Sequence, residues 1–257
     1  MKSILVTGAG SGVGFEVVKL FLEKGFKVGG LDINVKALNE LQAQGQANLF
    51  AYKCDVSCRS GVHDAIEQFA TVCGGVIDVV HSNAGIQASG LFKDVELEKY
   101  EMMNLINAMG TIYIIKEALP YVMASEAGAI LLTSSASAIT GLPMFSVYGA
   151  TKSFVTSLGE SLSIELESDG IYVGIIEPGL INTPMNSNNP DSMVCTEQEI
   201  TLGPKEVAEA AYQAISTRRQ LYWHVGEEAH DLAEAIQGLR LQERQRFVKQ
   251  MIQSKLK

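Results

Sequence analysis

The feature that most constrains the fold lies near the N-terminus, where a short apolar run meets a cluster of glycines. Residues 3–6 are apolar enough for a buried strand, and the sequence Thr7-Gly8-Ala9-Gly10-Ser11-Gly12-Val13-Gly14 follows directly. Residues 12–24 then repeat apolar side chains at helical spacing. Because helix N-termini attract anions, a strand, a glycine-rich turn and a helix in this order predict a nucleotide phosphate site.

Each glycine of this turn has a separate expected role. Gly8 permits the tight turn, Gly12 lets the backbone approach a pyrophosphate, and Gly14 allows the helix to pack closely against the strand. The spacing is TGxxxGxG rather than the commoner GxGxxG. The alternative is a plain glycine-rich turn between a strand and a helix that binds no ligand.

The second expected strand, residues 27–32, ends in an acid. Asp32 lies 18 residues beyond Gly14, where a carboxylate can accept hydrogen bonds from the ribose hydroxyls of an adenosine and would repel a 2′-phosphate. Ser11 and Ile33 stand where a basic residue could neutralise that phosphate. The sequence therefore predicts NAD rather than NADP. Asp32 could also cap the helix that follows, and the two roles are compatible.

Strands and helices are expected to alternate along the whole chain. Expected strands are residues 3–6, 27–32, 49–53, 76–81, 129–133, 171–176 and 220–225; expected helices are 12–24, 34–44, 57–72, 97–124 (one long or two stacked), 147–168, 204–216 and a helix with a tail over 227–257. This alternation predicts α/β architecture: a doubly wound, seven-stranded parallel sheet with helices on both faces. We expect one domain over 1–257, with its core at 3–183, a lid loop at 185–203 and a helical tail at 239–257.

Chemically suggestive residues recur where the expected strands end. They are Asp55-Val56, Asn83-Ala84-Gly85, Ser135 and Pro178-Gly179. Ligands of parallel α/β sheets bind at this carboxyl edge, so these residues should share one site with the glycine-rich turn. For Asp55 the residues alone leave two roles open, a contact with an adenine amino group or a cap for the next helix.

Tyr148 and Lys152 lie one turn apart on an expected helix and so share a face. A free tyrosine is a poor base at neutral pH, but a nearby ammonium favours the phenolate and lowers the pKa. The pair could then exchange a proton, as a general acid/base must. Two unrelated residues on an amphipathic helix remain the alternative for so short a pattern.

Composition excludes several other classes of function. The net charge of -9 argues against nucleic-acid binding and against docking on anionic membranes. The cysteines Cys54, Cys58, Cys73 and Cys195 form no CxxC pair and the four histidines are scattered, so we expect no metal site and reduced thiols. Reduced thiols fit a cytoplasmic enzyme best. Neither a signal peptide nor a membrane-spanning segment is expected. We interpret His81 as a hydrogen-bonded strand residue rather than a catalyst.

Together these motifs resemble those of the short-chain dehydrogenase/reductase family. The matching residues are Thr7-Gly8-(x)3-Gly12-x-Gly14, Asp55-Val56, Asn83-Ala84-Gly85, Asn107, Ser135, Tyr148-(x)3-Lys152 and Pro178-Gly179-(x)3-Thr183. The resemblance implies a Rossmann-type fold and an oxidoreductase that uses a nicotinamide cofactor. Family spacing selects Asn107 over Asn104 through Gly110 and Pro120, and it selects Ser135 because this serine lies 13 residues before Tyr148.

The resemblance also implies a role for each residue. Tyr148 would be the acid/base, Lys152 would lower its pKa and hold the nicotinamide ribose, Ser135 would bind the substrate oxygen, and Asn107 would anchor a proton-relay water. The backbone near Ile181 and the Thr183 hydroxyl would hold the carboxamide. The full expected cofactor set is Gly8, Ser11, Gly12, Val13, Gly14, Asp32, Ile33, Asp55, Val56, Asn83, Ala84, Gly85, Tyr148, Lys152, Pro178, Gly179, Ile181 and Thr183.

The substrate pocket is expected to form from the loops at 86–91, 136–145 and 185–193. Its apolar members would be Ile139, Leu142, Met144, Phe145 and Met185, and no arginine or lysine occurs in these stretches. This predicts a small, neutral, fairly apolar secondary alcohol or ketone, and the resemblance implies a homodimer or homotetramer. Two alternatives are an NADPH-dependent 3-oxoacyl-thioester reductase and a non-catalytic, cofactor-sensing scaffold. The basic tail is interpreted as a solvated helix face, with a subunit contact as the alternative.

Overall fold

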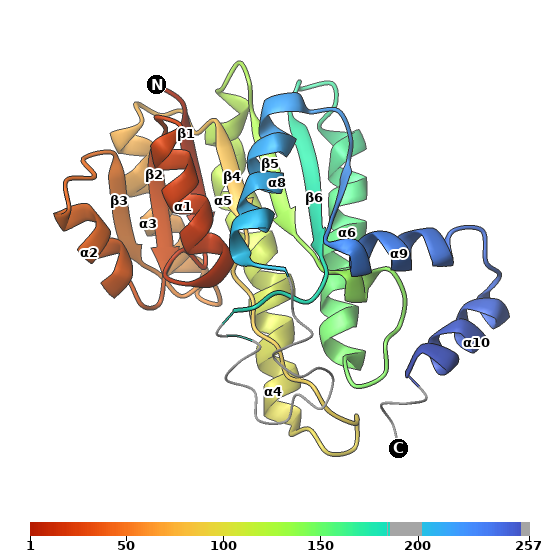
Figure 1. Ribbon diagram of the computed structural model, residues 1–257. Coiled ribbons are helices and arrows are strands. Elements are labelled where there is room, and N and C mark those ends of the chain that lie inside the picture. The colour runs from red at the N-terminus through yellow and green to blue at the C-terminus, as the bar shows by residue number, and fades with distance from the viewer. Residues whose placement is uncertain (184, 186–201, 253–257) are drawn as a thin grey trace.

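The computed structural model describes residues 1–183, 185 and 202–252, and its framework is one parallel sheet (Figure 1). Seven strands lie in the order β3-β2-β1-β4-β5-β6-β7, and every neighbouring pair is parallel. The strands are β1 (Ser3–Thr7), β2 (Lys27–Asp32), β3 (Leu49–Lys53), β4 (Val79–Ser82), β5 (Ala129–Thr133), β6 (Tyr172–Pro178) and β7 (Tyr222–Val225).

Helices cover both faces of this sheet, which confirms the predicted doubly wound fold (Figure 1). They are α1 (Gly12–Glu23), α2 (Lys36–Ala43), α3 (Arg59–Val72), α4 (Leu97–Met103), α5 (Thr111–Met123), α6 (Ser146–Glu165), α8 (Pro204–Thr217), α9 (Glu227–Ile236) and α10 (Leu241–Ile252). A π-helical segment, η1 (Asn104–Gly110), joins α4 to α5, and a 3-10 turn, η2 (Ala136–Ala138), follows β5.

Successive strand residues feed two separate cores, because side chains alternate between the faces of a sheet. Ile4 and Val6 pack on one face with α1 and α8, and Leu5 packs on the other with α3, α5 and α6. All three side chains are fully buried. Burial on both faces explains why the strands are continuously apolar rather than alternating.

The strand order reverses between β1 and β4, and this reversal positions the site. From β1 the chain winds outward through β2 and β3 and then returns to β4 on the other side. The loops after β1 and β4 therefore diverge at the carboxyl edge, where open α/β sheets bind ligands. The glycine-rich turn follows β1, and Asn83 follows β4.

Several expected boundaries differ from the structure, and two of the differences have clear local reasons. The fourth strand begins at Val79 rather than at residue 76, because Ile77 N–H donates to Tyr121 O (3.1 Å) instead of joining the sheet. The Asp78 carboxylate then accepts from Ser3 N at 2.7 Å and Ser3 Oγ at 3.1 Å. The C-terminal stretch expected as a helix and tail forms two helices, broken by Gly238 with a φ of 80°.

Candidate active site

A cavity of about 870 Å³ opens at the carboxyl edge of the sheet, and nearly every predicted site residue lines it. From the predicted set, the lining residues are Gly8, Ser11, Gly12, Val13, Asp32, Ile33, Asp55, Val56, Asn83, Ala84, Gly85, Ser135, Tyr148, Lys152, Pro178, Gly179, Ile181 and Thr183. Gly14 and Asn107 are the two predicted site residues that do not line the cavity. The structure thus brings together residues that span most of the chain.

The glycine-rich turn has the backbone that its sequence predicts. Gly8 and Gly12 have φ values of 65° and 54°, a region that residues with a Cβ rarely occupy. Gly14 is required for a different reason: a Cβ there would lie 2.1 Å from Gly8 O. The first helical turn of α1 therefore packs directly against the glycine-rich loop. A Cβ on Gly12 would lie 3.5 Å from Thr183 Cγ2, so Gly12 lies beside the Thr183 side chain.

Asp32 is held rigidly at the edge of the cavity. Its Oδ2 accepts from Gly10 N at 2.8 Å, and its Oδ1 accepts from Asn34 N at 2.9 Å. It does not cap the next helix, since α2 begins at Lys36 and has no side-chain cap. Two amide donors hold the carboxylate in one orientation with its charge toward the cavity.

Asp55 combines a local bond with a place in the cavity wall. Its Oδ1 accepts from Ser57 N at 2.9 Å and from Ser57 Oγ at 2.7 Å. The N-cap residue of α3 is Cys58, so Asp55 shapes the turn before the helix rather than capping the helix itself. The side chain also lines the cavity beside Val56, which leaves an adenine contact open to it.

Ser135, Tyr148 and Lys152 meet on the opposite wall of the cavity. The Ser135 hydroxyl lies close enough to the Tyr148 phenol to lower its pKa, and it accepts from Ser137 N at 3.2 Å. Lys152 Nζ lies 5.8 Å from the centre of the Tyr148 ring and donates to Thr133 O at 2.8 Å. Gly149 permits this arrangement, because a Cβ there would lie 2.9 Å from Ser137 O.

Burial controls the proton affinities of the pair. It raises the pKa of Tyr148 to about 12, against a smaller lowering by the Ser135 hydrogen bond, and it lowers the pKa of Lys152 to about 8. The sequence predicted that Lys152 lowers the Tyr148 pKa. In the chain without a bound ligand the pKa of the phenol is raised, because desolvation of the phenolate outweighs the Ser135 contact.

Asn107 lies in the π-helical segment that interrupts the helical region predicted at 97–124. Its amide Nδ2 donates to Ile86 O at 2.9 Å and to Thr151 Oγ1 at 3.0 Å, and its Oδ1 accepts from Ile86 N at 2.8 Å. An ideal Cβ on Gly85 would lie 3.2 Å from Asn107 Oδ1 and 3.4 Å from Lys152 Nζ. Asn107 therefore ties the loop after β4 to the helix of the tyrosine.

Asn107→Ala should damage the site, and Asn104→Ala is the matched control. The first change leaves the partly buried N–H and C=O of Ile86 without their Asn107 partners, a cost of about 1–3 kcal/mol, and we expect kcat to fall at least about tenfold. Asn104 is exposed and donates only to Tyr100 O of its own helix, so its loss should be nearly neutral. Steady-state kinetics of both variants makes the comparison; the reverse order of effects would show that the asparagine is misassigned.

The C-terminal helices form a wall that sequence reasoning missed. Lining residues from α9 and α10 are Glu228, Asp231, Leu232, Ala235, Phe247 and Met251. Of the predicted apolar lining, Leu142, Phe145 and Met185 face the cavity, but Ile139 and Met144 do not. Amphipathic spacing in α9 and α10 was the available signal, yet it could not tell which element those faces would cover. The predicted lid lies almost wholly outside the described residues.

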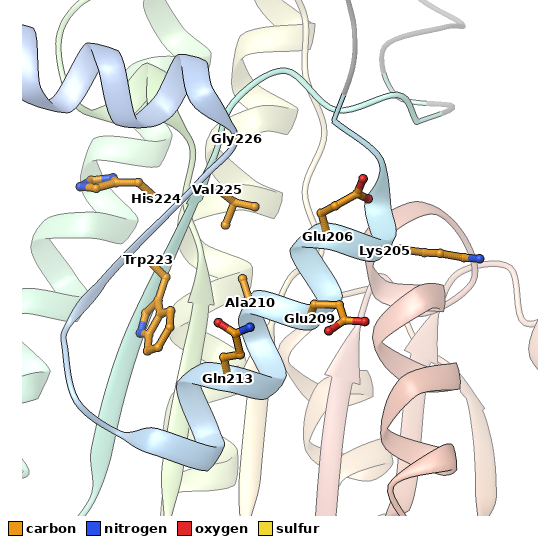
Figure 2. A pocket seen from close by; sticks show the side chains of 9 residues that line it. All are labelled: Lys205, Glu206, Glu209, Ala210, Gln213, Trp223, His224, Val225 and Gly226. Carbon is orange, nitrogen blue, oxygen red and sulfur yellow. The ribbon is translucent and has the colours of Figure 1, made fainter.

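A second, open cavity of about 530 Å³ lies between α8 and β7 (Figure 2). Its lining residues are Lys205, Glu206, Glu209, Ala210, Gln213, Trp223, His224, Val225 and Gly226. The His224 ring points away from the acidic side chains of α8 (Figure 2). No predicted site residue lines this cavity, so the candidate site is the cavity at the carboxyl edge.

Comparison with known proteins agrees with this geometry. The family model described as short chain dehydrogenase matches residues 2–193. The chain belongs to the short-chain dehydrogenase family. A 2,5-dichloro-2,5-cyclohexadiene-1,4-diol dehydrogenase of Sphingobium indicum is 32% identical to this short-chain dehydrogenase over 186 residues, covering 72% of this chain and 74% of the relative.

Two solved structures extend the comparison of this short-chain dehydrogenase. One from Streptomyces avermitilis superposes with a TM-score of 0.83 at 24% identity, covering 98% of this chain and 97% of that one. A 3-ketoacyl-(acyl-carrier-protein) reductase of Brucella melitensis, complexed with NADH, has a TM-score of 0.79 at 26% identity, covering 87% and 96%. The first comparison shows the fold, and membership of the family makes this chain an oxidoreductase that acts on CH–OH groups.

The site fits the nicotinamide dinucleotide that the family binds. The positive-φ glycines leave a cradle beside the helix N-terminus, and the lining extends from there to Tyr148 and Lys152. Among residues 1–183, 185 and 202–252, no cluster of three or more metal-ligating side chains occurs. In the same part of the chain, no helix is both long and apolar enough to cross a bilayer.

Proposed function

We propose that this short-chain dehydrogenase is an NAD-dependent enzyme that interconverts a secondary alcohol and a ketone, with Tyr148 as acid/base. The observation that carries the proposal is the shared cavity: the glycine-rich turn and Asp32 form one part of its wall, and Ser135, Tyr148 and Lys152 form another. The glycine-rich turn would hold the phosphates of a dinucleotide in this cavity, and the residues around Tyr148 would hold its nicotinamide end.

Residues at the ends of different strands would each bind a different part of the cofactor. The backbone of the glycine-rich turn and the N-terminus of α1 would hold the pyrophosphate, Asp32 the adenosine ribose, and Asp55 with Val56 the adenine. Lys152 would hold the nicotinamide ribose, and the Ile181 backbone and Thr183 the carboxamide. When bound, the nicotinamide ring supplies or accepts the hydride, and its oxidised form adds a positive charge that favours the phenolate.

The chain's own residues handle the proton. Ser135 donates to the substrate oxygen, where charge develops, and Tyr148 gives or takes the proton at the same oxygen. Lys152 is held by Thr133 O, and Asn107 fixes the loop and helix on either side of it. We place the relay of protons to solvent along the path from Tyr148 through Lys152 to the neighbourhood of Asn107.

Asp32 supports NAD over NADP. The two amide donors keep its charge fixed where a 2′-phosphate would lie, and Lys152 is the one basic residue among the described residues that line the cavity. Like-charge repulsion and loss of the ribose hydrogen bonds therefore both act against the phosphorylated cofactor.

NADH should bind to the wild-type protein at least about tenfold more tightly than NADPH, and Asp32→Ala should remove most of that difference. Fluorescence titration of the wild-type protein and of the variant with both cofactors measures this difference in affinity. Asp55→Ala is the matched control, because Asp55 lies at the adenine end of the cavity and its loss should affect both cofactors alike. Equal affinity of the wild-type protein for NADH and NADPH would contradict the role of Asp32.

The substrate is proposed to be small, neutral and fairly apolar. Leu142, Phe145 and Met185 give the described lining apolar contacts near the catalytic residues. Glu228 and Asp231 on α9 add negative charge, which disfavours anionic substrates. The same charge, together with Asp32, counts against an NADPH-dependent reductase of thioesters on an acidic carrier.

A panel of neutral secondary alcohols and ketones, followed by NADH absorbance, tests the proposed reaction. We expect turnover with several members and little with matched carboxylate-bearing analogues. The 3-oxoacyl-thioester alternative is favoured by one observation, the similarity to the Brucella melitensis reductase. Turnover confined to 3-oxoacyl thioesters would support that alternative, and NADH binding with no turnover on any substrate would support a non-catalytic scaffold.

We also propose a homo-oligomer acting in the cytoplasm. Met102, Leu105 and Met109 on α4 and η1 are 36–43% exposed, and Phe154 on the adjacent α6 is 39% exposed. An apolar face of this kind is typical of a self-complementary contact. Light scattering after size exclusion should give a dimer or tetramer, and Phe154→Asp should shift it toward monomer.

A further inference from the structure

One buried histidine outside the catalytic set touches the hydrogen-bond network of the site. His81 lies in β4 with no exposed surface, between Val6 of β1 and Leu131 of β5. Its Nε2 lies 2.8 Å from Thr133 Oγ1, and its Nδ1 has no hydrogen-bond partner. A buried polar atom without a partner costs free energy that an apolar side chain would avoid. The retained imidazole therefore calls for an explanation.

The direction of each hydrogen bond in this network follows from one acceptor. Thr7 O can only accept, so Asn83 Nδ2, at 3.0 Å, donates to it, and this fixes the orientation of the Asn83 amide. Asn83 Oδ1 is then an acceptor, and the Thr133 hydroxyl donates its single hydrogen there at 3.2 Å. With that hydrogen committed, Thr133 Oγ1 can only accept from His81 Nε2.

His81 is therefore the terminal donor of a polarised chain, with its proton on Nε2 and Nδ1 bare. Burial lowers the pKa of His81 to about 3, so the ring is neutral at physiological pH and carries a single N–H. His81 is paired with Leu131, so by alternation its side chain points to the same face of the sheet as that of Thr133, two residues further along β5. Asn83 lies one residue beyond the end of β4 and reaches the Thr133 hydroxyl from the loop.

This chain of hydrogen bonds contacts two parts of the proposed active site. At its far end from His81, Asn83 holds the residue that opens the glycine-rich turn, since Thr7 Oγ1 also accepts from Asn83 N and Ala84 N, each at 3.0 Å. In its middle, the carbonyl of Thr133 accepts from Lys152 Nζ at 2.8 Å. Thr133 thus links the catalytic lysine, through its carbonyl, to the cofactor turn, through its hydroxyl.

We infer that His81, protonated on Nε2, is a positioning residue that orients the Thr133 hydroxyl and, through it, the Asn83 amide beneath the glycine-rich turn. Without this donor Thr133 Oγ1 loses one of its two partners, and its hydroxyl is held less firmly toward Asn83 Oδ1. The role is to preorganise the cofactor turn, and no proton is exchanged with the substrate. This inference rests on the proposed cofactor site for its functional consequence.

The tautomer is the first test, and it needs neither cofactor nor substrate. A long-range proton–nitrogen spectrum of the histidine-labelled wild-type protein, with His81 assigned through His81→Gln, should show a neutral ring protonated on Nε2. A ring protonated on Nδ1, or a charged ring at neutral pH, would overturn the chain of donors. Because this spectrum is recorded without ligand, its outcome is independent of the proposed function.

The second test is a double-mutant cycle read by titration with whichever reduced cofactor the wild-type protein binds more tightly. Thr133→Val removes the hydroxyl but keeps the carbonyl that holds Lys152. His81→Leu and Thr133→Val should each weaken binding roughly three- to tenfold, and the double variant should match Thr133→Val because His81 acts through Thr133. Multiplicative effects in the double variant would show that His81 acts independently and would overturn the inference.

A conservative pair covers the case in which His81→Leu fails to fold. The amide nitrogen of glutamine can reach the Nε2 position, whereas that of asparagine is too short. We expect His81→Gln to bind the cofactor as the wild-type protein does and His81→Asn to be weakened like Thr133→Val. Wild-type affinity in His81→Asn would overturn the positioning role, whereas failure of the wild-type protein to bind any nicotinamide cofactor would contradict the proposed function.

Discussion

Tyr148→Phe should lower kcat about a thousandfold while leaving NADH binding nearly intact. The change removes one hydroxyl, and with it the proton donor and acceptor of the reaction, for which general acid/base catalysis supplies typically about 10²–10⁴ in rate. The ring remains beside Lys152 and against Phe145, so the cavity keeps its shape. Steady-state assays that follow NADH absorbance give kcat, and fluorescence titration gives the affinity for NADH.

Tyr113→Phe is the matched control for that variant. Tyr113 lies on α5 and does not line the cavity, so removal of its hydroxyl should leave turnover unchanged. The kcat of Ser135→Ala should lie between those of Tyr148→Phe and Tyr113→Phe, because this change removes a contact with the same phenol but leaves the phenol in place. Substantial activity in Tyr148→Phe would mean that another group carries the proton.

Residues tied to backbone requirements were predictable from the sequence. Gly8 and Gly12 occupy positive φ, so their identity is dictated by the local backbone. At Gly149 a Cβ would lie 2.9 Å from Ser137 O, so the close approach of the two segments excludes a larger residue. The alternation of apolar strands and amphipathic helices similarly specifies the order of elements. Since parallel strands all end at one edge, placing the strands was enough to place Asn83 and Pro178 in the same site.

Other features depend on contacts that no local pattern encodes. The π-helical segment containing Asn107 has the composition of an ordinary helix, and its different hydrogen bonding is visible only with its partners Ile86 and Thr151 in place. Phe247 of α10 lines the cavity although it lies far along the chain from the predicted site residues. Sequence periodicity shows which faces are apolar, but the partner of each face is set by the whole fold.

The Tyr148 pKa shows the same limit in electrostatics. Helical spacing correctly places Lys152 near the ring, but the sign of the shift depends on the balance between charge and desolvation. Burial prevails in the chain by itself and raises the phenol pKa to about 12. The closeness of Lys152 to the ring therefore does not by itself give the direction of the Tyr148 pKa shift.

Gly14→Ala should be the most damaging single methyl group that can be added to the cofactor turn. The new Cβ would lie 2.1 Å from Gly8 O and 2.8 Å from Asn83 Nδ2, so the turn must move away from α1. We expect the free energy of unfolding to fall by about 3 kcal/mol and NADH affinity to fall more than about tenfold. Thermal or urea unfolding and cofactor titration measure the two effects.

Gly61→Ala separates this steric effect from the general effect of alanine in a helix. Gly61 lies inside α3, and a Cβ there would meet nothing nearer than Cys58 Sγ at 3.7 Å. Alanine should therefore stabilise this helix by about 0.5–1 kcal/mol and leave NADH binding unchanged. The two variants share the same chemical change and the same secondary structure, so opposite signs would trace the loss in Gly14→Ala to contact with Gly8 and Asn83. Wild-type cofactor affinity in Gly14→Ala would instead show that the turn does not cradle the pyrophosphate.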